Sequence, residues 1–148
     1  MKLVLLGPPG AGKGTHAKVM GEKYSLVHLA AGDTLRRHIR EQTELGKKAK
    51  DTIEKGELVS DDLVNAMMAD EIKSAGLSKG FILDGYPRTL GQAEALDTFL
   101  TKENVQLDLT LDFATSEKVI VDRLSGRRIC PKCNANYHIR NIPPKKEG

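Results

Sequence analysis

The sequence predicts an α/β protein built on a parallel β-sheet with helices on both of its faces. The first observation is that short apolar runs without polar alternation, such as residues 2–6 and 81–84, suit strands buried on both faces. The second is that these runs alternate with helical patterns along the chain, which is the order of a parallel sheet. The third is that 148 residues, 39% hydrophobic and 29% charged, have the size and composition of one globular domain.

The expected elements alternate over most of the chain. Strands are expected at residues 2–6, 27–29, 81–84 and 107–113. Helices are expected at residues 13–24, 34–39, 44–55, 61–75, 89–100 and 116–125. The helix boundaries come from the expected N-caps and from the glycines after the last turns, which are Asp33, Ser60, Gly56, Gly76 and Gly126. The predicted inward face of the first helix is Ala17, Val19, Met20 and Tyr24.

The pattern changes after residue 126. Residues 127–138 contain Cys130-Pro-Lys-Cys133 and predict a β-hairpin, and residues 141–148 are a basic, turn-rich segment. Two cysteines this close do not indicate a disulfide framework, but they have the spacing of half a zinc site. His138 is a weak candidate for a third ligand, and a redox pair is less favoured because no strand-to-helix context surrounds the cysteines. With two thiols alone, we expect zinc to bind weakly or not at all.

The overall charge and hydropathy exclude several classes of protein. The net charge of +3 at pH 7 is too small and too evenly spread for a DNA or RNA partner, but it suits small polyanions. The first apolar run is too short for a signal peptide, and no stretch has the length of a membrane span. We therefore expect a cytoplasmic protein without nucleic-acid or membrane partners, and we also expect a monomer.

The chemistry begins at residues 7–15, Gly-Pro-Pro-Gly-Ala-Gly-Lys-Gly-Thr, between the first strand and the first helix. Strand, glycine-rich loop and helix is the context of a phosphate-binding loop, or P-loop. Glycines let successive N–H groups turn inward around an anion, and the helix N-terminus adds partial positive charge. Lys13 is expected to reach the outer phosphates, and Thr15 is expected to hold Mg²⁺ directly or through water.

Further polar residues lie near the ends of other elements. Asp84 ends a buried strand, where a carboxylate holds water ligands of Mg²⁺ or, as the alternative, caps a helix. Arg36, Arg88, Arg123 and Arg127 lie near element ends, and a guanidinium pairs phosphate oxygens bidentately. No Ser/His/Asp arrangement or carboxylate pair is evident, which fits phosphoryl transfer by positioning and charge stabilisation.

Four motifs together resemble the adenylate kinase family along the whole chain. They are residues 7–15, Gly32-Asp-x-Leu-Arg36, Asp84-Gly-Tyr-Pro-Arg-Thr-x-x-Gln92 and Asp122-Arg-Leu-x-Gly-Arg-Arg128. The resemblance implies Mg²⁺-dependent, reversible phosphoryl transfer from ATP to AMP, which yields two ADP and serves nucleotide homeostasis. It also implies a P-loop NTPase-type sheet with a small helical AMP-binding insertion and the start of a β-hairpin lid. The implied division is core at 1–29 and 60–125, insertion at 30–59 and lid at 126–148.

The resemblance also implies roles for individual residues. The implied ATP site is Gly10, Ala11, Gly12, Lys13, Gly14, Thr15, Arg123, Arg127, Asn136 and Tyr137. The implied AMP site is Ala31, Arg36, Glu57, Leu58, Val59, Gly85, Tyr86, Pro87, Arg88 and Gln92, with Gln92 reading the adenine. The implied catalytic set is Lys13, Asp84, Arg88, Arg123 and Arg127. Cys130 and Cys133 resemble the first half of the zinc-bearing lid of some members, so structural zinc is implied for a complete lid.

Two departures from the family pattern leave alternatives open. Ala31 replaces a usual Ser or Thr, as in uridylate and cytidylate kinases, whereas Thr89 and Gln92 follow the adenylate pattern. The family also continues beyond residue 148 through the rest of the lid, a further strand and a final helix. We therefore expect a chain that ends at Gly148 to turn over ATP and AMP poorly. A GTPase-like switch, or a nucleotide-binding module without turnover, is the alternative from another class, although no guanine signature is evident.

Overall fold

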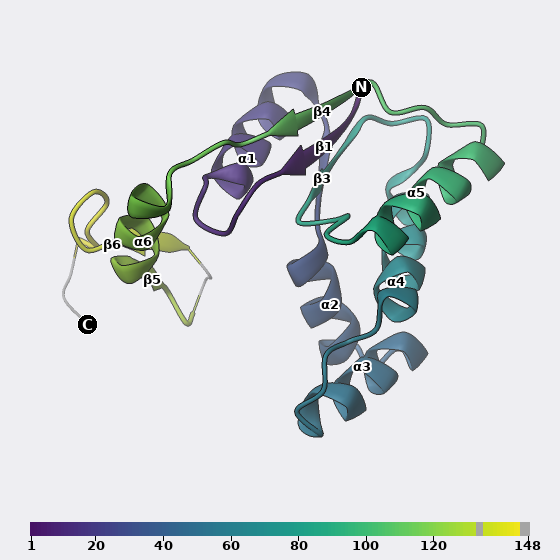
Figure 1. Ribbon diagram of the computed structural model, residues 1–148, viewed down its shortest axis with the longest axis horizontal. Helices are drawn as coiled ribbons and strands as arrows, with labels where there is room; N and C mark the ends of the chain where they lie inside the picture. Colours follow the sequence, from purple (N-terminus) through teal and green to yellow (C-terminus); the bar gives the residue numbers. More distant parts are fainter. Residues whose placement is uncertain (133–134, 146–148) are drawn as a thin grey trace. The chain divides into compact units, whose positions relative to one another are not determined.

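The computed structural model describes residues 1–132 and 135–145, and the chain divides into two compact units (Figure 1). The larger one, called here the sheet unit, contains Met1–Leu6 and Lys13–Asp112. The smaller one, called here the hairpin unit, contains Gly7–Gly12 and Phe113–Gly148. The glycine-rich loop therefore packs with the C-terminal part of the chain, although it joins two elements of the sheet unit.

The sheet unit contains a four-stranded sheet whose strands are all parallel. The strands are β1 (Lys2–Leu6), β2 (Val27–Ala30), β3 (Phe81–Asp84) and β4 (Leu109–Asp112), in the order β2-β3-β1-β4. The register pairs Asp84 with Leu5 on one side and with Ala30 on the other. The parallel sheet is thereby confirmed, and the chain leaves β2 and β3 at the same edge.

Helices flank this sheet. They are α1 (Lys13–Tyr24), α2 (Ala31–Arg40), α3 (Glu44–Glu54), α4 (Asp61–Ala75) and α5 (Leu90–Lys102). Helix α1 packs against β1, β2 and β3, while α4 and α5 lie side by side (Figure 1). Helix α2 continues from the end of β2 and contacts both α3 and α4. The helical segment around α2 and α3 is the part that the sequence predicts as an insertion.

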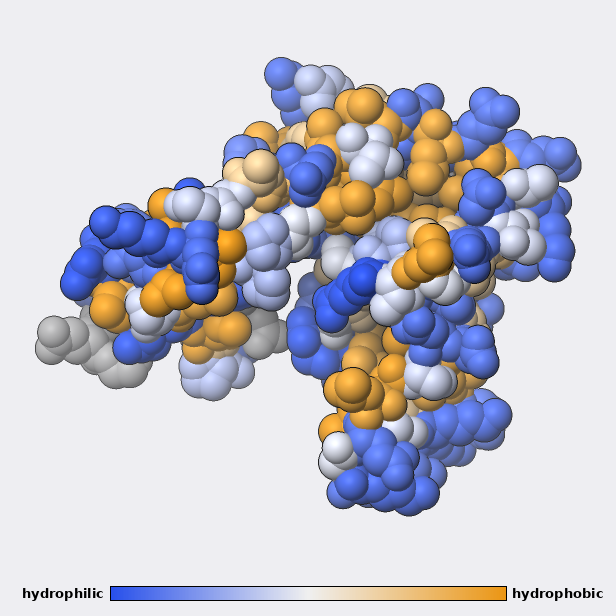
Figure 2. Space-filling view, viewed as in Figure 1, coloured by the Kyte–Doolittle hydropathy of each residue, from blue (hydrophilic) through white to orange (hydrophobic). Residues whose placement is uncertain are grey.

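The hydrophobic core lies between the sheet and helices α4 and α5. Its buried side chains are Val4, Leu29, Met68, Ile72, Phe81, Leu83, Tyr86, Leu96 and Leu100. Phe81 and Leu83 are fully buried, as expected of an unbroken apolar run in a strand covered on both faces. Strand β4 is an edge of the sheet, and its Leu109 is 51% exposed. Figure 2 shows that hydrophobic residues also lie on the surface of this unit.

Of the predicted N-caps in the sheet unit, Ser60 is confirmed and Asp33 is not, while Thr89, predicted as the first residue of a helix, is the cap of α5. Ser60 and Thr89 cap α4 and α5, since each side chain accepts a hydrogen bond from a backbone N–H three residues on. The predicted cap at Asp33 is wrong, because α2 begins at Ala31 and follows β2 without a turn. Asp33 lies in the first turn of α2, where its carboxylate pairs with Arg36 instead of capping.

The predicted inward face of α1 is wrong at Val19 and Tyr24. Val19 and Tyr24 are 57% and 51% exposed, whereas Ala17 is fully buried. A Cβ on Gly21 would lie only 3.1 Å from the carbonyl oxygen of Leu26, so the helix backbone approaches its neighbours closely. The small residues Ala17 and Gly21 make this close packing possible. A prediction based on large apolar side chains at helical spacing overlooks such a face.

The hairpin unit contains α6 (Glu117–Ser125), β5 (Arg127–Ile129) and β6 (Asn136–His138). The two strands pair antiparallel with Arg127 opposite His138, which confirms the predicted hairpin. Gly126 follows the last residue of α6, as predicted. A Cβ on Gly126 would overlap the imidazole ring of His138, so glycine is needed where the ring packs against the end of α6.

Candidate active site

The glycine-rich loop turns through backbone conformations that favour glycine. Gly7, Gly10 and Gly12 have φ angles of +128°, +83° and +102°. A Cβ on Gly7 would lie 2.9 Å from the carbonyl oxygen of Phe113, and one on Gly10 would lie 3.0 Å from Leu124 Cγ. A side chain at either position would therefore strain the backbone and displace its neighbours. The loop keeps the glycine conformations that a cradle of backbone N–H groups requires.

Two arginines of the hairpin unit are fixed by hydrogen bonds. Arg123 Nη1 donates to the carbonyl oxygens of Gly10 and Ala11 at 3.3 and 3.1 Å. Arg127 donates from Nε and Nη2 to Asn136 Oδ1 at 3.0 and 2.7 Å. The structure thus brings Arg123 together with two predicted ATP residues of the loop, and Arg127 together with a third on the paired strand.

Tyr137 and Asn136, the two predicted ATP residues on β6, differ in their surroundings. Tyr137 is half-buried on β6 and pairs in register with Arg128. Asn136 is exposed, and its side-chain oxygen is occupied by Arg127. Within the hairpin unit, a ligand would therefore meet Tyr137 through its partly exposed ring and Asn136 only after competition with Arg127.

Asp84, the last residue of β3, lies close to the start of α1. A Cβ on Gly14 would be 3.2 Å from Asp84 Oδ2, so the carboxylate lies against the helical turn that carries Lys13 and Thr15. Asp84 Oδ2 is also 3.2 Å from His28 Nε2, and the Asp84 side chain is 14% exposed. Carboxylate and hydroxyl oxygens are the hard donors that Mg²⁺ takes, so Asp84 and Thr15 fit this ion.

The turn after Asp84 is held by its own side chains. Gly85 has a φ angle of +72°, and its carbonyl oxygen accepts a hydrogen bond from Arg88 Nε at 2.7 Å. Tyr86 is 2% exposed and donates its hydroxyl hydrogen to Asn65 Oδ1 at 2.8 Å. Burial raises the pKa of Tyr86 to about 12, with a further contribution from the charge of Asp61. Arg88 itself is exposed, with its guanidinium folded back over the turn.

Gln92 lies in the first turn of α5 and is 5% exposed. Its Nε2 donates to Asp61 Oδ1 at 2.6 Å, and its Oε1 accepts from the backbone N–H of Arg88 at 2.8 Å. Asp61 Oδ2 also accepts a hydrogen bond from Thr89 Oγ1 at 2.6 Å. The side chain predicted to read a base is therefore already held at both ends of its amide group.

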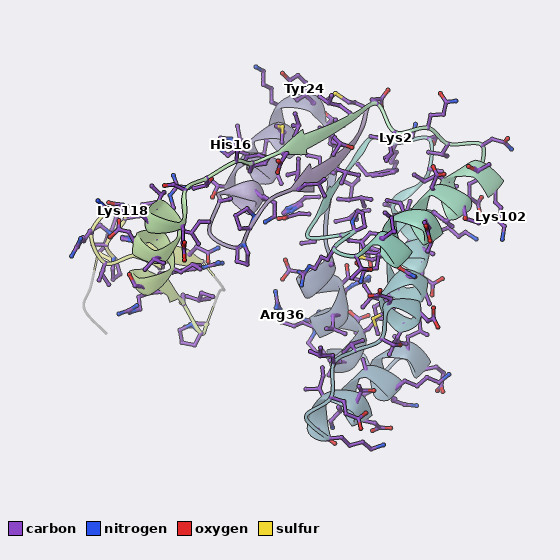
Figure 3. The ribbon with its side chains drawn as sticks, in the orientation of Figure 1. Lys2, His16, Tyr24, Arg36, Lys102 and Lys118 are labelled. Atoms are coloured by element: carbon purple, nitrogen blue, oxygen red, sulfur yellow. The ribbon has the colours of Figure 1, made fainter. Side chains whose placement is uncertain are left out.

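The remaining predicted AMP residues lie on α2 and on the segment before α4. Arg36 is 72% exposed and pairs with Asp33 Oδ1 at 2.6 Å, and Figure 3 shows it projecting from α2 on the side away from α4. Ala31 is the first residue of α2. Leu58 is 95% exposed, so its side chain does not line a formed base pocket, while Val59 is half-buried.

The predicted half site for zinc is only partly described. The backbone N–H of Cys130 donates to Ala135 O at 2.9 Å, whereas Cys133 lies outside the described residues. His138 Nδ1 accepts from the backbone N–H groups of Arg140 and Asn141, so the other ring nitrogen carries the hydrogen and faces Asp122 O at 3.2 Å. Both ring nitrogens of His138 are thus occupied. Within residues 1–132 and 135–145, no three His, Cys, Asp or Glu side chains cluster as a metal site.

Sequence reasoning missed two polar residues that contact the predicted site. The sequence places Asp61 only at the start of the helix expected at 61–75, and His28 only within the strand expected at 27–29. Asp61 lies 31 positions from Gln92, and His28 lies 56 positions from Asp84. No local pattern reports such contacts. The available signal for His28 was a titratable side chain in an otherwise apolar strand.

A parallel sheet with a glycine-rich loop between its first strand and the following helix is typical of proteins that bind nucleotide phosphates. The comparison with protein families narrows this class. The sequence model of the family "Adenylate kinase" matches residues 5–143. The chain belongs to the adenylate kinase family.

Individual relatives agree with this family. Adenylate kinase of Clostridium novyi (strain NT) is 51% identical over 148 residues, which is 100% of this chain and 68% of the relative. Adenylate kinase of Clostridium botulinum (strain Langeland) is 49% identical over the same shares of both chains. Adenylate kinase of Clostridium kluyveri is 47% identical over 145 residues, 98% of this chain and 67% of the relative.

The family gives the chain its class of activity. Adenylate kinases are phosphotransferases that interconvert adenine nucleotides, so the predicted enzyme class is confirmed and the pyrimidine alternative is not favoured. ATP and AMP are the family's substrates, and Mg²⁺ accompanies ATP in the family. Among the described residues, no helix is both long and apolar enough to cross a membrane.

Proposed function

We propose that this chain binds MgATP through residues 7–15, Arg123 and Arg127, and binds AMP through residues of the sheet unit. The observation that carries the proposal is the loop itself, whose glycines adopt positive φ angles directly after β1. A loop of this kind offers consecutive N–H groups to an anion, and the N-terminus of α1 follows it at once. Asn136 and Tyr137 are the proposed hairpin contacts to ATP.

The donor side would work through fixed cations. Arg123 is tied to the backbone of the loop by its hydrogen bonds to Gly10 and Ala11. A guanidinium held in this way is preorganised, so it needs little rearrangement when charge moves between phosphates. Lys13 supplies a second positive charge from the first residue of α1. We assign catalytic roles to these two residues, to Arg127 and, on the acceptor side, to Arg88.

The acceptor side would use Arg36 and Arg88 for the AMP phosphate. Each guanidinium is now held by a local oxygen, the carboxylate of Asp33 for Arg36 and the carbonyl of Gly85 for Arg88. A phosphate offers Arg88 stronger, bidentate hydrogen bonds than the single carbonyl of Gly85 does. The pair of Arg36 with Asp33 is exposed on both sides, and exposed ion pairs contribute little, so AMP can take over both contacts. The proposed base contacts are Ala31, residues 57–59, Gly85–Pro87 and Gln92.

Mg²⁺ would be held through water by Asp84 and Thr15, whose oxygens fit the ion. The ion would neutralise charge on the phosphates of ATP. His28 orients the carboxylate of Asp84. The lysine and arginines proposed above would supply the positive charge around the phosphates. Catalysis then rests on positioning and charge stabilisation, with no protein nucleophile.

Several broader features remain proposals. We propose the division into core (1–29 and 60–125), AMP-binding insertion (30–59) and lid (126–148), and a monomer that works in the cytoplasm. Structural zinc in a complete lid would involve Cys130 and Cys133, with further ligands from elsewhere than His138.

A calorimetric titration with ATP tests the phosphate-binding role of the loop. The Lys13→Ala change removes a charge-assisted contact to phosphate, so the affinity for ATP should fall by roughly 1.5–3 kcal/mol. Lys18→Ala is the matched control, because Lys18 is an exposed lysine on the same helix. Equal ATP affinity in both variants would contradict the assignment of Lys13.

A further inference from the structure

Asp61 joins two elements through a pair of short hydrogen bonds. It is the first residue of α4, and its two carboxylate oxygens accept from Gln92 Nε2 and Thr89 Oγ1, each at 2.6 Å. Both donors belong to the start of α5. The hydrogen bond from Thr89 fixes the orientation of the Asp61 carboxylate. The carboxylate in turn holds the amide group of Gln92, whose side chain is 5% exposed.

The surroundings of Gln92 determine which way its amide group points. On one side the backbone N–H of Arg88 can only donate, so it requires the amide oxygen. On the other side the carboxylate of Asp61 can only accept, so it requires the amide nitrogen. A rotation of the amide by half a turn would place donor against donor and acceptor against acceptor. The two ends therefore define a single orientation.

The fixed amide still has hydrogen-bonding capacity. An amide nitrogen has two hydrogens and its oxygen has two lone pairs, so one of each remains after the bonds to Asp61 and Arg88. This remaining edge, one acceptor and one donor in a set order, complements the amino group and ring nitrogen of adenine. A purine with an oxygen at position 6 would place an acceptor against the amide oxygen. The order of donor and acceptor thus separates a 6-amino from a 6-oxo purine.

We propose that Asp61 is a positioning residue that sets the preference for AMP over inosine monophosphate (IMP) by holding the Gln92 amide in one orientation. The inference rests on the proposed role of Gln92 in reading the base. AMP and IMP differ at the 6-position and in the hydrogen on the adjacent ring nitrogen, so they test the orientation of the amide directly. A residue that only stabilised the fold would change the affinity for both nucleotides alike.

The test compares dissociation constants of AMP and IMP by calorimetry for the whole chain and for two variants. Asp61→Asn replaces a pure acceptor by an amide that can face Gln92 with its donor or its acceptor, so that of the two fixing groups the N–H of Arg88 alone remains. Asp62→Asn is the matched control, since it removes the same charge from the neighbouring, exposed residue. We expect the wild-type preference for AMP to shrink at least about tenfold in Asp61→Asn, as unpaired polar contacts at a base edge govern such discrimination. It should be unchanged in Asp62→Asn.

An unchanged ratio in Asp61→Asn, or an equal loss of affinity for both nucleotides, would overturn the inference. The variant Gln92→Leu shows whether such a result overturns only the role of Asp61 or also the proposed role of Gln92 in reading the base. If Gln92→Leu leaves the affinity for AMP unchanged, the base-reading role itself is wrong. If it weakens AMP binding while Asp61→Asn keeps the full preference, only the role of Asp61 is wrong.

A measurement on the wild-type chain covers the case in which Asp61→Asn does not fold. In ¹⁵N NMR spectra, the side-chain N–H pair of Gln92 should exchange slowly with solvent because one hydrogen is bonded to Asp61. Added AMP should shift this pair, and IMP at the same concentration should shift it far less. Fast exchange in the free chain, or equal shifts with both nucleotides, would contradict the proposal.

Discussion

His28 Nε2 lies 3.2 Å from Asp84 Oδ2, across two neighbouring parallel strands. The register pairs His28 with Ile82, and Asp84 is two residues further along β3, so both polar side chains extend from the same face of the sheet. The histidine is the partner that orients the carboxylate proposed to hold the water ligands of Mg²⁺. The contact therefore links His28, inside strand β2, to the residue proposed to hold Mg²⁺.

Removal of this histidine should change the response to Mg²⁺. In His28→Leu, Asp84 loses its hydrogen-bond partner, and we expect a several-fold higher Mg²⁺ concentration at half-maximal rate and a loss of about 1 kcal/mol in unfolding free energy. His28→Gln keeps a donor on a side chain of similar reach, so it should lie much closer to wild type. The measurement is the rate of ADP formation against Mg²⁺ concentration. Identical curves for both variants would show that His28 does not orient Asp84.

Tyr86 should make the folded state less stable at alkaline pH. Its pKa in the folded chain is about 12, above the ordinary value of 10.0. The unfolded chain therefore loses this proton first, so the contribution is fully present below about pH 10 and falls as the pH rises toward about 12. Urea unfolding at several pH values in this range should show a steeper decline for wild type than for Tyr86→Phe. Parallel declines would contradict the raised pKa.

Two helical glycines should respond oppositely to alanine. A Cβ on Gly46 would overlap the backbone carbonyl of His38, which cannot move aside as a flexible side chain would. Gly46→Ala should therefore lower the unfolding free energy by about 1–3 kcal/mol. A Cβ on Gly91 would meet only Asp61 Oδ2, at an ordinary 3.7 Å. Gly91→Ala should be neutral or stabilise by up to about 1 kcal/mol, because alanine favours helix. Urea unfolding that ranks the two variants the other way would contradict the packing of α2 against α3.

The strands and most helix boundaries were predictable because their signals are local. Residues 81–83 are apolar without interruption, and all three are fully buried in β3. Ser60 and Thr89 cap helices through hydrogen bonds within one turn. Asp33 had the same local signal, but β2 leads directly into α2 and places it inside the helix.

The site was predictable only in part. The glycine loop and Arg123 come together as the motifs imply. Asp61 could not be found from sequence, because its role depends on the packing of α4 against α5. A charge in the first turn of a helix is usually explained by the helix dipole alone. Contacts between residues far apart in the sequence can therefore be identified only once the fold is known.

The choice of acceptor tests the central claim most directly. ADP formation from ATP is measured with AMP, CMP and UMP at equal, subsaturating concentrations, so that the ratio of rates does not depend on the absolute rate. UMP would place its 4-oxygen, an acceptor, against the amide oxygen of Gln92. CMP has an amino group and a ring nitrogen in the same order as adenine, but its smaller ring would leave the fixed edge of the amide out of reach and unpaired. Unpaired buried polar groups reject a ligand strongly. We predict a rate with AMP at least about 100-fold above the rates with CMP and UMP. An equal rate with CMP would contradict the account and make Ala31 the better guide to the acceptor.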